Sequence, residues 1–200
     1  MINIREYELL TLETGAFKDI ELDILKEALE TWKLNPGKPY ELIELRDGRT
    51  LAGYCLYYRS PNTEYTYDVH SFVVGRDYRS SAVGIRLLEL LEEAILVKER
   101  YAVLRVETSR TKEASLGAEF FNTNGFQTIG HIPGFYELDN DYYIYVRAVS
   151  RAQKLAAEEA ARKAAEGSGG PAGGASAGGD ASAGGDASGT EGDAAGESST

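Results

Sequence analysis

The sequence is poor in the residues that hold metals and form disulfides. Cys55 is its only cysteine, so neither an internal disulfide nor a cysteine-based zinc site is expected. His70 and His131 are its only histidines and lie far apart in the sequence, so we expect no metal site. Charged residues interrupt the first thirty positions. The sequence therefore indicates neither a signal peptide nor a membrane span, and it predicts a cytoplasmic protein.

Large aliphatic side chains are missing from the last 34 residues, 167–200, which contain 12 of the 22 glycines. This segment cannot bury enough apolar surface to offset the entropy of ordering it, so we expect a disordered, solvated spacer. The run "ASAGGD" occurs there twice in tandem, as is typical of a low-complexity tail. Residues 150–166 are rich in Ala, Glu and Lys and predict a helix. Residues 1–149 remain for one globular domain.

Positive charge is also scarce. The net charge is −11, and five of the acids lie in the tail, which has no Lys or Arg, so the rest of the chain carries −6. An acidic domain argues against nucleic-acid binding. It would tolerate a cationic substrate, although a charge of this size also serves solubility alone.

The sequence does contain a regular alternation of helical and strand periodicities. Apolar residues recur at helical spacing in three segments, which are 17–32, 84–95 and 112–124, the last closed by Gly125. Strand patterns occupy 1–10, 40–59 as a hairpin joined at Asp47-Gly48, 65–74, 101–108, and the two sides of a loop at 133–140.

The order of these segments predicts the fold class. Strand 101–108 is apolar enough to be buried largely on both faces. It follows strand 65–74 through a helix, which suggests a right-handed crossover with parallel pairing. With the antiparallel meander before it, the sequence predicts an α/β fold with a mixed sheet.

The turn between strand 65–74 and the next helix carries Arg79, Ser80, Ser81, Ala82, Val83 and Gly84. A helix N-terminus presents free backbone N–H groups and a partial positive charge, and small residues let an anion approach them. Arg79 adds a formal charge, and the serines add hydroxyl donors. The turn is therefore a phosphate-site candidate, although small polar residues at such turns also serve as helix caps.

This turn resembles the signature of the GNAT superfamily of acetyl-CoA-dependent N-acetyltransferases. The family's pattern of Arg or Gln, two residues, Gly, one residue, then Gly or Ala is matched by Arg79, Ala82 and Gly84, with Ala82 in place of the usual Gly. "FFNTNGF" resembles the family's helix end at Gly125-Phe126. The closing "IGHIPGFYELDNDYYIYVR" is similar to members that acetylate protein N-termini, such as ribosomal-protein alanine acetyltransferases.

The resemblance implies a mostly antiparallel central sheet, flanked by helices and splayed between strands 4 and 5. It implies that acetyl-CoA binds there as co-substrate, without a metal. The backbone of Phe72, Val73 and Val74 would contact the acetyl and pantetheine part. The pyrophosphate would rest on the turn from Arg79 to Gly84, through Ser80, Ser81, Ala82 and Val83.

Acetyl transfer to an amine needs a base, an oxyanion donor and an acid for the thiolate. The resemblance indicates Glu107 as the base, with Asp68 and His70, which share one face of a strand, as rivals. The family's usual acid, a tyrosine, is Phe121 in this chain. Tyr136 is therefore expected to act as the acid. Tyr142 is an alternative, and a third possibility is that the thiolate leaves unassisted.

Two functions follow from this interpretation. The first is an N-acetyltransferase in which a primary amine, on a protein N-terminus or a small molecule, attacks acetyl-CoA directly in a ternary complex. Cys55 is then a core residue rather than an acyl carrier. The second is an acyl-CoA-binding or sensing module of the same fold, which Phe121 and Ala82 favour. We expect a monomer or homodimer that binds neither nucleic acid nor membrane.

Overall fold

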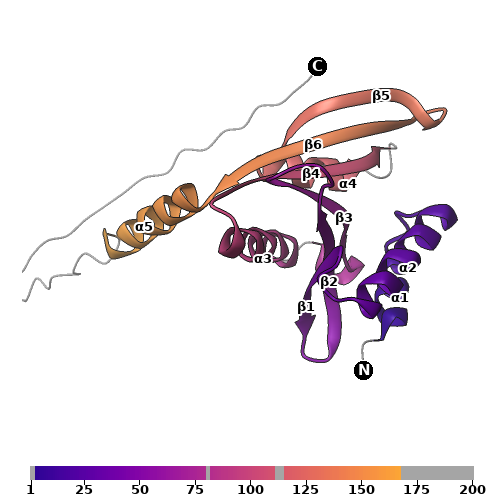
Figure 1. Ribbon diagram of the computed structural model, residues 1–200, viewed down its shortest axis with the longest axis horizontal. Helices are drawn as coiled ribbons and strands as arrows, with labels where there is room; N and C mark the ends of the chain where they lie inside the picture. Colours follow the sequence, from indigo (N-terminus) through magenta and orange to yellow (C-terminus); the bar gives the residue numbers. More distant parts are fainter. Residues whose placement is uncertain (1–2, 80–81, 111–114, 168–200) are drawn as a thin grey trace, which may run out of the picture.

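A six-stranded sheet forms the centre of the protein, seen in a computed structural model that describes residues 3–79, 82–110 and 115–167 (Figure 1). Its strand order is β1-β2-β3-β4-β6-β5. The strands are β1 (Tyr40–Asp47), β2 (Thr50–Arg59), β3 (Thr66–Val74), β4 (Tyr101–Arg110), β5 (Gln127–Glu137) and β6 (Asn140–Ser150). Only β3 and β4 pair in parallel, and every other neighbouring pair is antiparallel. The predicted mixed, mostly antiparallel sheet is confirmed.

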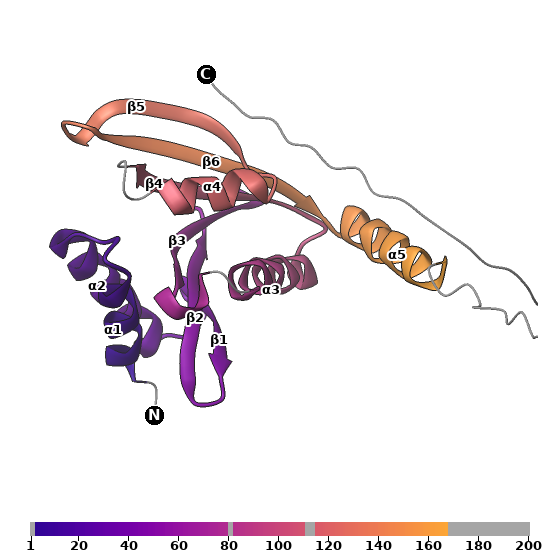
Figure 2. The ribbon, with the colours of Figure 1, turned by 180° about the vertical axis from the view of Figure 1, so that it is seen from behind.

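Helices cover both faces of the sheet. The helices are α1 (Ile4–Thr14), α2 (Asp19–Leu34), α3 (Val83–Lys98), α4 (Ser115–Thr123) and α5 (Arg151–Gly167), with a short 3-10 turn at Arg76–Tyr78. Helices α1 and α2 lie on one side of the sheet and α3 on the other, as two opposite views show (Figures 1 and 2). Each side buries its own core. Leu25 and Leu29 pack with Tyr54 on the first side, and Leu87 and Leu91 pack with Leu104 on the second.

The predicted strand in residues 1–10 is wrong, because the segment from Ile4 onward belongs to helix α1. Tyr7, Leu10, Thr11 and Thr14 are buried at helical spacing, and Gly15 ends the helix with a φ of 65°. The strand that the resemblance counts as the fourth is therefore β3, and the fifth is β4. The splay between strands 4 and 5 lies here between β3 and β4.

Strand β4 is not buried on both faces as predicted. Ala102, Leu104 and Val106 alternate into the core beneath α3, whereas Arg105, which is half-buried, and Glu107, which is exposed, project from the opposite face. The second half of the strand therefore has one apolar and one polar face, and the polar face lies on the same side of the sheet as α1 and α2 (Figure 1).

Two predicted turns also differ from the structure. Asp47 pairs with Thr50, so the first hairpin turns at Gly48-Arg49, one residue later than predicted. Most of the expected loop at 133–140 is strand, because β5 runs to Glu137 and β6 begins at Asn140. Asp141 makes this possible, since its carboxylate accepts the Gly134 N–H at 2.8 Å and holds His131 at 2.7 Å across the irregular part of the ladder.

Residues Arg151–Gly167 form helix α5, which leaves the end of β6 and points away from the sheet (Figure 1). Arg151 anchors its start, donating from Nε to the carbonyl of Leu96 at 3.0 Å. The predicted tail, apart from Gly167, lies outside the described residues. Among the helices that the structure describes, none is both long and apolar enough to cross a membrane.

Candidate functional site

The pairing between strands β3 and β4 ends about halfway along both strands. Their parallel pairing begins at Thr66 with Val103 and ends at Val69 with Val106. Both strands continue, to Val74 and Arg110, without a further pair between them in the described part of the chain. The backbone of each strand beyond this point is therefore available on the side where the other strand would lie.

A β-bulge lies where the two strands separate. Opposite β2, Val69 pairs with Tyr57 and Ser71 with Leu56, so His70 is the extra residue. Because of this extra residue, the side chains of β3 after the bulge point to the opposite face from the one that simple alternation would give. Val69 packs in the core under α3, whereas Val73 packs in the core under α1 and α2.

The predicted pantetheine contacts lie in this separated half of β3. The side chain of Val73 is buried, and those of Phe72 and Val74 are half-buried. Phe72 faces α4, where its ring lies 5.5 Å from that of Phe120. The backbone of these residues pairs with β2 on one side only. Their role toward a cofactor remains a prediction.

The predicted phosphate turn is only partly described, because Ser80 and Ser81 lie outside the described residues. Ala82 caps the N-terminus of α3 without a side-chain hydrogen bond, and the first turn carries no acidic residue. The N-terminal N–H groups there keep their attraction for an anion. The guanidinium of Arg79 donates from Nη2 to the Thr14 carbonyl at 2.9 Å, so the turn is tied to the C-terminal end of α1.

Gly84 and Phe121 have packing roles in this structure. A Cβ on Gly84 would lie 3.0 Å from Cε2 of Phe120, so the glycine lets α4 approach α3 closely. Phe121 is buried in the core, with its ring 5.7 Å from that of Phe72 and 5.1 Å from that of Phe126. The position where the family has a tyrosine is therefore an aromatic core position in this chain.

On the opposite face of the sheet, Asp68 and Arg105 form a two-pronged ion pair. Arg105 Nε lies 2.6 Å from Asp68 Oδ1, and Nη2 lies 3.0 Å from Oδ2. The Asp68 side chain is buried, so the arginine is its principal compensation. Arg105 engages both carboxylate oxygens and the side chain is buried, so an acceptor amine reaches Asp68 less readily than it reaches the exposed Glu107. The geometry therefore ranks Asp68 below Glu107 as a base.

Glu107 lies beside this pair and is more open. Its carboxylate is 3.4 Å from Arg105 Nη2, and its side chain is 44% exposed. Glu107 pairs with Ile144 on β6, which makes Tyr142 its diagonal neighbour on the same face. Burial and then the hydrogen bond to Glu107 raise the pKa of Tyr142 to about 12.

The predicted acid, Tyr136, joins the same group from β5. Its ring lies 6.0 Å from that of Tyr142. Burial and then the charges of Glu21 and Glu107 raise its pKa. The structure thus brings Glu107, Tyr136 and Tyr142 together, and both phenols keep their protons at neutral pH.

The other rival base, His70, is half-buried at the bulge. Its ring packs edge-on against Tyr40 at 5.5 Å, and Nδ1 lies 2.9 Å from Ser71 Oγ. Burial lowers the pKa of His70, so the imidazole is neutral at neutral pH. It can accept a proton, and it remains an alternative to Glu107. Cys55 is buried in the core as predicted, and burial raises the pKa of its thiol.

Arg105 and Phe135 are parts of this site that the sequence interpretation missed. Arg105 was detectable, because it lies two residues before Glu107 on one strand and so shares its face. Phe135 was assigned to a loop and carried no such signal. Within the described ranges, no three His, Cys, Asp or Glu side chains gather in a group that could hold a metal ion.

Comparisons with known proteins were made with both sequence and structure. The family model for the acetyltransferase (GNAT) family matches residues 6–126. A search of curated protein sequences found no match. A solved structure from Desulfovibrio desulfuricans, assigned to the GNAT acetyltransferases, is 25% identical, has a TM-score of 0.65 and covers 71% of this chain and 89% of its own.

Two further solved structures share the fold at lower identity. The ribosomal-protein-S18-alanine N-acetyltransferase from Escherichia coli is 16% identical, with a TM-score of 0.54 and coverage of 75% of this chain and 91% of its own. An aminoglycoside 6'-N-acetyltransferase complexed with coenzyme A is 16% identical, with a TM-score of 0.55 and coverage of 73% and 89%. The family match spans more than half of the sequence and includes strands β3 and β4, which separate beyond Val69 and Val106. The chain therefore belongs to the acetyltransferase (GNAT) family.

Proposed function

We propose that the protein transfers an acetyl group from acetyl-CoA to a primary amine by direct attack in a ternary complex. The observation that carries this proposal is the separation of β3 and β4 beyond Val69 and Val106. The N-terminus of α3, which follows β3 in the chain, lies on one side of the sheet. Glu107 on β4 and Tyr142 on β6 project from the other side. Cofactor and amine would approach the separated strands from opposite sides.

The cofactor would be held by the residues named from the resemblance. The free backbone of Phe72, Val73 and Val74 would pair with pantetheine, and the turn from Arg79 to Gly84 would hold the pyrophosphate. The residues described there fit an anion, since α3 begins without an acidic residue and Ala82 is exposed. Arg79 would divide its donors between a phosphate and the Thr14 carbonyl.

In the proposed reaction, Glu107 takes a proton from the acceptor ammonium. The neutral amine nitrogen then bonds to the thioester carbonyl carbon, the C–S bond breaks and coenzyme A leaves as a thiolate, while the nitrogen loses its second proton, which passes to the thiolate directly or through Tyr136. Tyr136 would protonate or hydrogen-bond the thiolate. Tyr142, with a pKa near 12, would give up its proton only reluctantly to a thiolate, so we assign it to positioning Glu107.

The test measures thiol release from acetyl-CoA with a panel of primary amines, which includes short peptides with free N-termini and small polyamines. We expect release that depends on the amine, and acetylated product confirmed by mass. The matched variant is Glu107→Gln, which should retain coenzyme A binding by calorimetry but lose turnover. Coenzyme A binding without turnover on any amine would overturn the enzyme and favour the acyl-CoA-binding module, which the buried Phe121 makes plausible.

A further inference from the structure

Three aromatic rings gather near the tip of the β5–β6 hairpin. The ring of Phe135 lies 4.9 Å from that of Tyr136 and 4.9 Å from that of Tyr142, and the two tyrosine rings are 6.0 Å apart. They are not core residues, since Phe135 is 55% and Tyr136 is 42% exposed. We call Phe135, Tyr136 and Tyr142 the aromatic triad.

Negative charge lies directly beside the aromatic triad. Glu107 hydrogen-bonds Tyr142, and its charge also acts on Tyr136, as does that of Glu21 from α2. The nearest cation on the sheet, Arg105, makes its closest contacts with Asp68 rather than Glu107. The triad therefore has partly exposed rings beside carboxylates that are not fully neutralised by a nearby cation.

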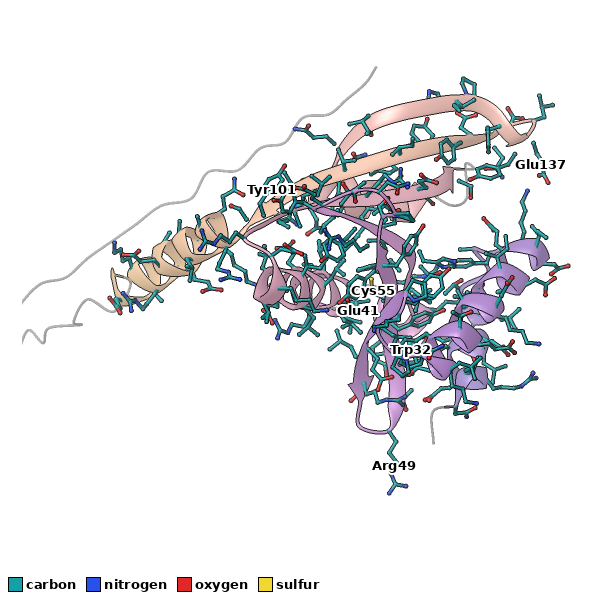
Figure 3. The ribbon with its side chains drawn as sticks, in the orientation of Figure 1. Trp32, Glu41, Arg49, Cys55, Tyr101 and Glu137 are labelled. Atoms are coloured by element: carbon teal, nitrogen blue, oxygen red, sulfur yellow. The ribbon has the colours of Figure 1, made fainter. Side chains whose placement is uncertain are left out.

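The hairpin tip also contacts the start of helix α2. Lys18, at the start of α2, forms an ion pair of 2.6 Å with Glu137, the last residue of β5. Figure 3 shows Glu137 at the tip of the hairpin, on the side of the sheet where α1 and α2 lie. Both side chains are largely exposed, so the pair contributes little stability. It places the hairpin tip beside the start of α2, on the side of the sheet where Glu107 projects.

We propose that the aromatic triad and Glu107 bind the acceptor in its cationic, ammonium form, which makes the protein selective for positively charged amines. This inference rests on the proposed function, whose acceptor it defines. Ring faces attract cations through their quadrupoles, and a carboxylate supplies the opposite charge. The ammonium would then lie beside Glu107, the group proposed to take its proton.

The first experiment measures binding without any acetyl donor. The probes are choline, a cation, and 3,3-dimethylbutan-1-ol, its neutral counterpart of almost equal shape, each titrated by NMR. We expect choline to bind about five- to thirtyfold more tightly, as cation–π attraction together with a carboxylate predicts. Equal affinities would overturn the proposal, because an apolar surface alone does not distinguish the two molecules.

Variants then assign the effect to the rings. Phe135→Leu keeps an apolar side chain without a ring face and should remove most of the preference for choline. Tyr142→Phe keeps the ring and should retain at least half of the affinity. The matched control is Tyr65→Leu, because Tyr65 and Tyr101 form an exposed ring pair, 6.3 Å apart, near the first residues of β3 and β4. An equal loss in the control would also refute the assignment.

Steady-state kinetics separates this inference from the proposed function. Phe135→Leu should raise KM for the best amine more than it lowers kcat, and Tyr65→Leu should change neither. Acetyl transfer with no preference for choline would overturn the ammonium site alone. A choline preference in a protein that acetylates no amine would overturn the proposed function and leave the cation site standing.

Discussion

The hydrogen bond between Tyr142 and Glu107 makes a prediction about stability at high pH. Tyr142→Phe keeps the aromatic ring but removes the hydroxyl that donates to the carboxylate. Burial is the largest cause of the raised pKa of Tyr142, and the hydrogen bond to Glu107 is the next. The variant therefore tests whether these residues, from β4 and β6, interact in solution.

The sign and size of the effect follow from that pKa. The phenol titrates near 10 in the unfolded chain and near 12 in the folded protein, so the folded state holds its proton more tightly. The stabilisation is complete below pH 10 and is lost as the pH rises from about 10 to about 12. This difference corresponds to roughly 2.7 kcal/mol, which partial exposure of the ring reduces to about 1.5 kcal/mol.

The assay is urea unfolding at pH 8 and pH 11, followed by the fluorescence of Trp32, the only tryptophan. Tyr142→Phe should lower the free energy of unfolding by about 1 kcal/mol at pH 8, because one hydrogen bond is lost, and by about 0.7 kcal/mol less than that at pH 11, because about half of the pH-dependent stabilisation is then gone from the parent protein. A double-mutant cycle with Glu107→Gln should give a coupling near 1 kcal/mol. Tyr101→Phe, an exposed control, should change stability by less than about 0.5 kcal/mol. An equal loss at both pH values, or no measurable coupling, would refute the reasoning.

Three further predictions concern single positions. Glu107→Gln should lower kcat/KM for the amine by about 10²- to 10⁴-fold, while calorimetry shows unchanged coenzyme A affinity. Arg79→Ala should weaken coenzyme A binding by about tenfold or more and lower the Tm, because the guanidinium also holds the Thr14 carbonyl; Arg79→Lys should recover part of the affinity. Gly53→Ala should destabilise the protein by about 1–3 kcal/mol in urea unfolding, since the new Cβ would lie 2.8 Å from the Val73 carbonyl oxygen.

The candidate site was only partly predictable. Glu107, Tyr136 and Tyr142 were each named from the sequence, but their proximity depends on the register of β4, β5 and β6. The same is true of the ion pair that ranks Asp68 below Glu107 as a base, since its partner, Arg105, is 37 positions away. Pattern and motif identify residue types, whereas a contact between distant strands is decided by how the sheet assembles.

The sequence by itself determined the helices α2, α3 and α5, the β1–β2 hairpin, strand β3 and the resemblance of the turn at 79–84 to the family signature. These segments carry complete local signals in apolar spacing, turn residues and caps. Only the tertiary structure decided that α1 is a helix, that β5 and β6 continue through the expected loop, and that β4 has a polar face. In each case the deciding contacts lie far along the chain: Tyr7 packs on Tyr54, and the polar face of β4 binds Asp68 of β3. The local sequence does not predict such contacts. Each joins residues far apart in the chain, and the entropy lost in bringing them together is offset only when the whole sheet and its covering helices form together.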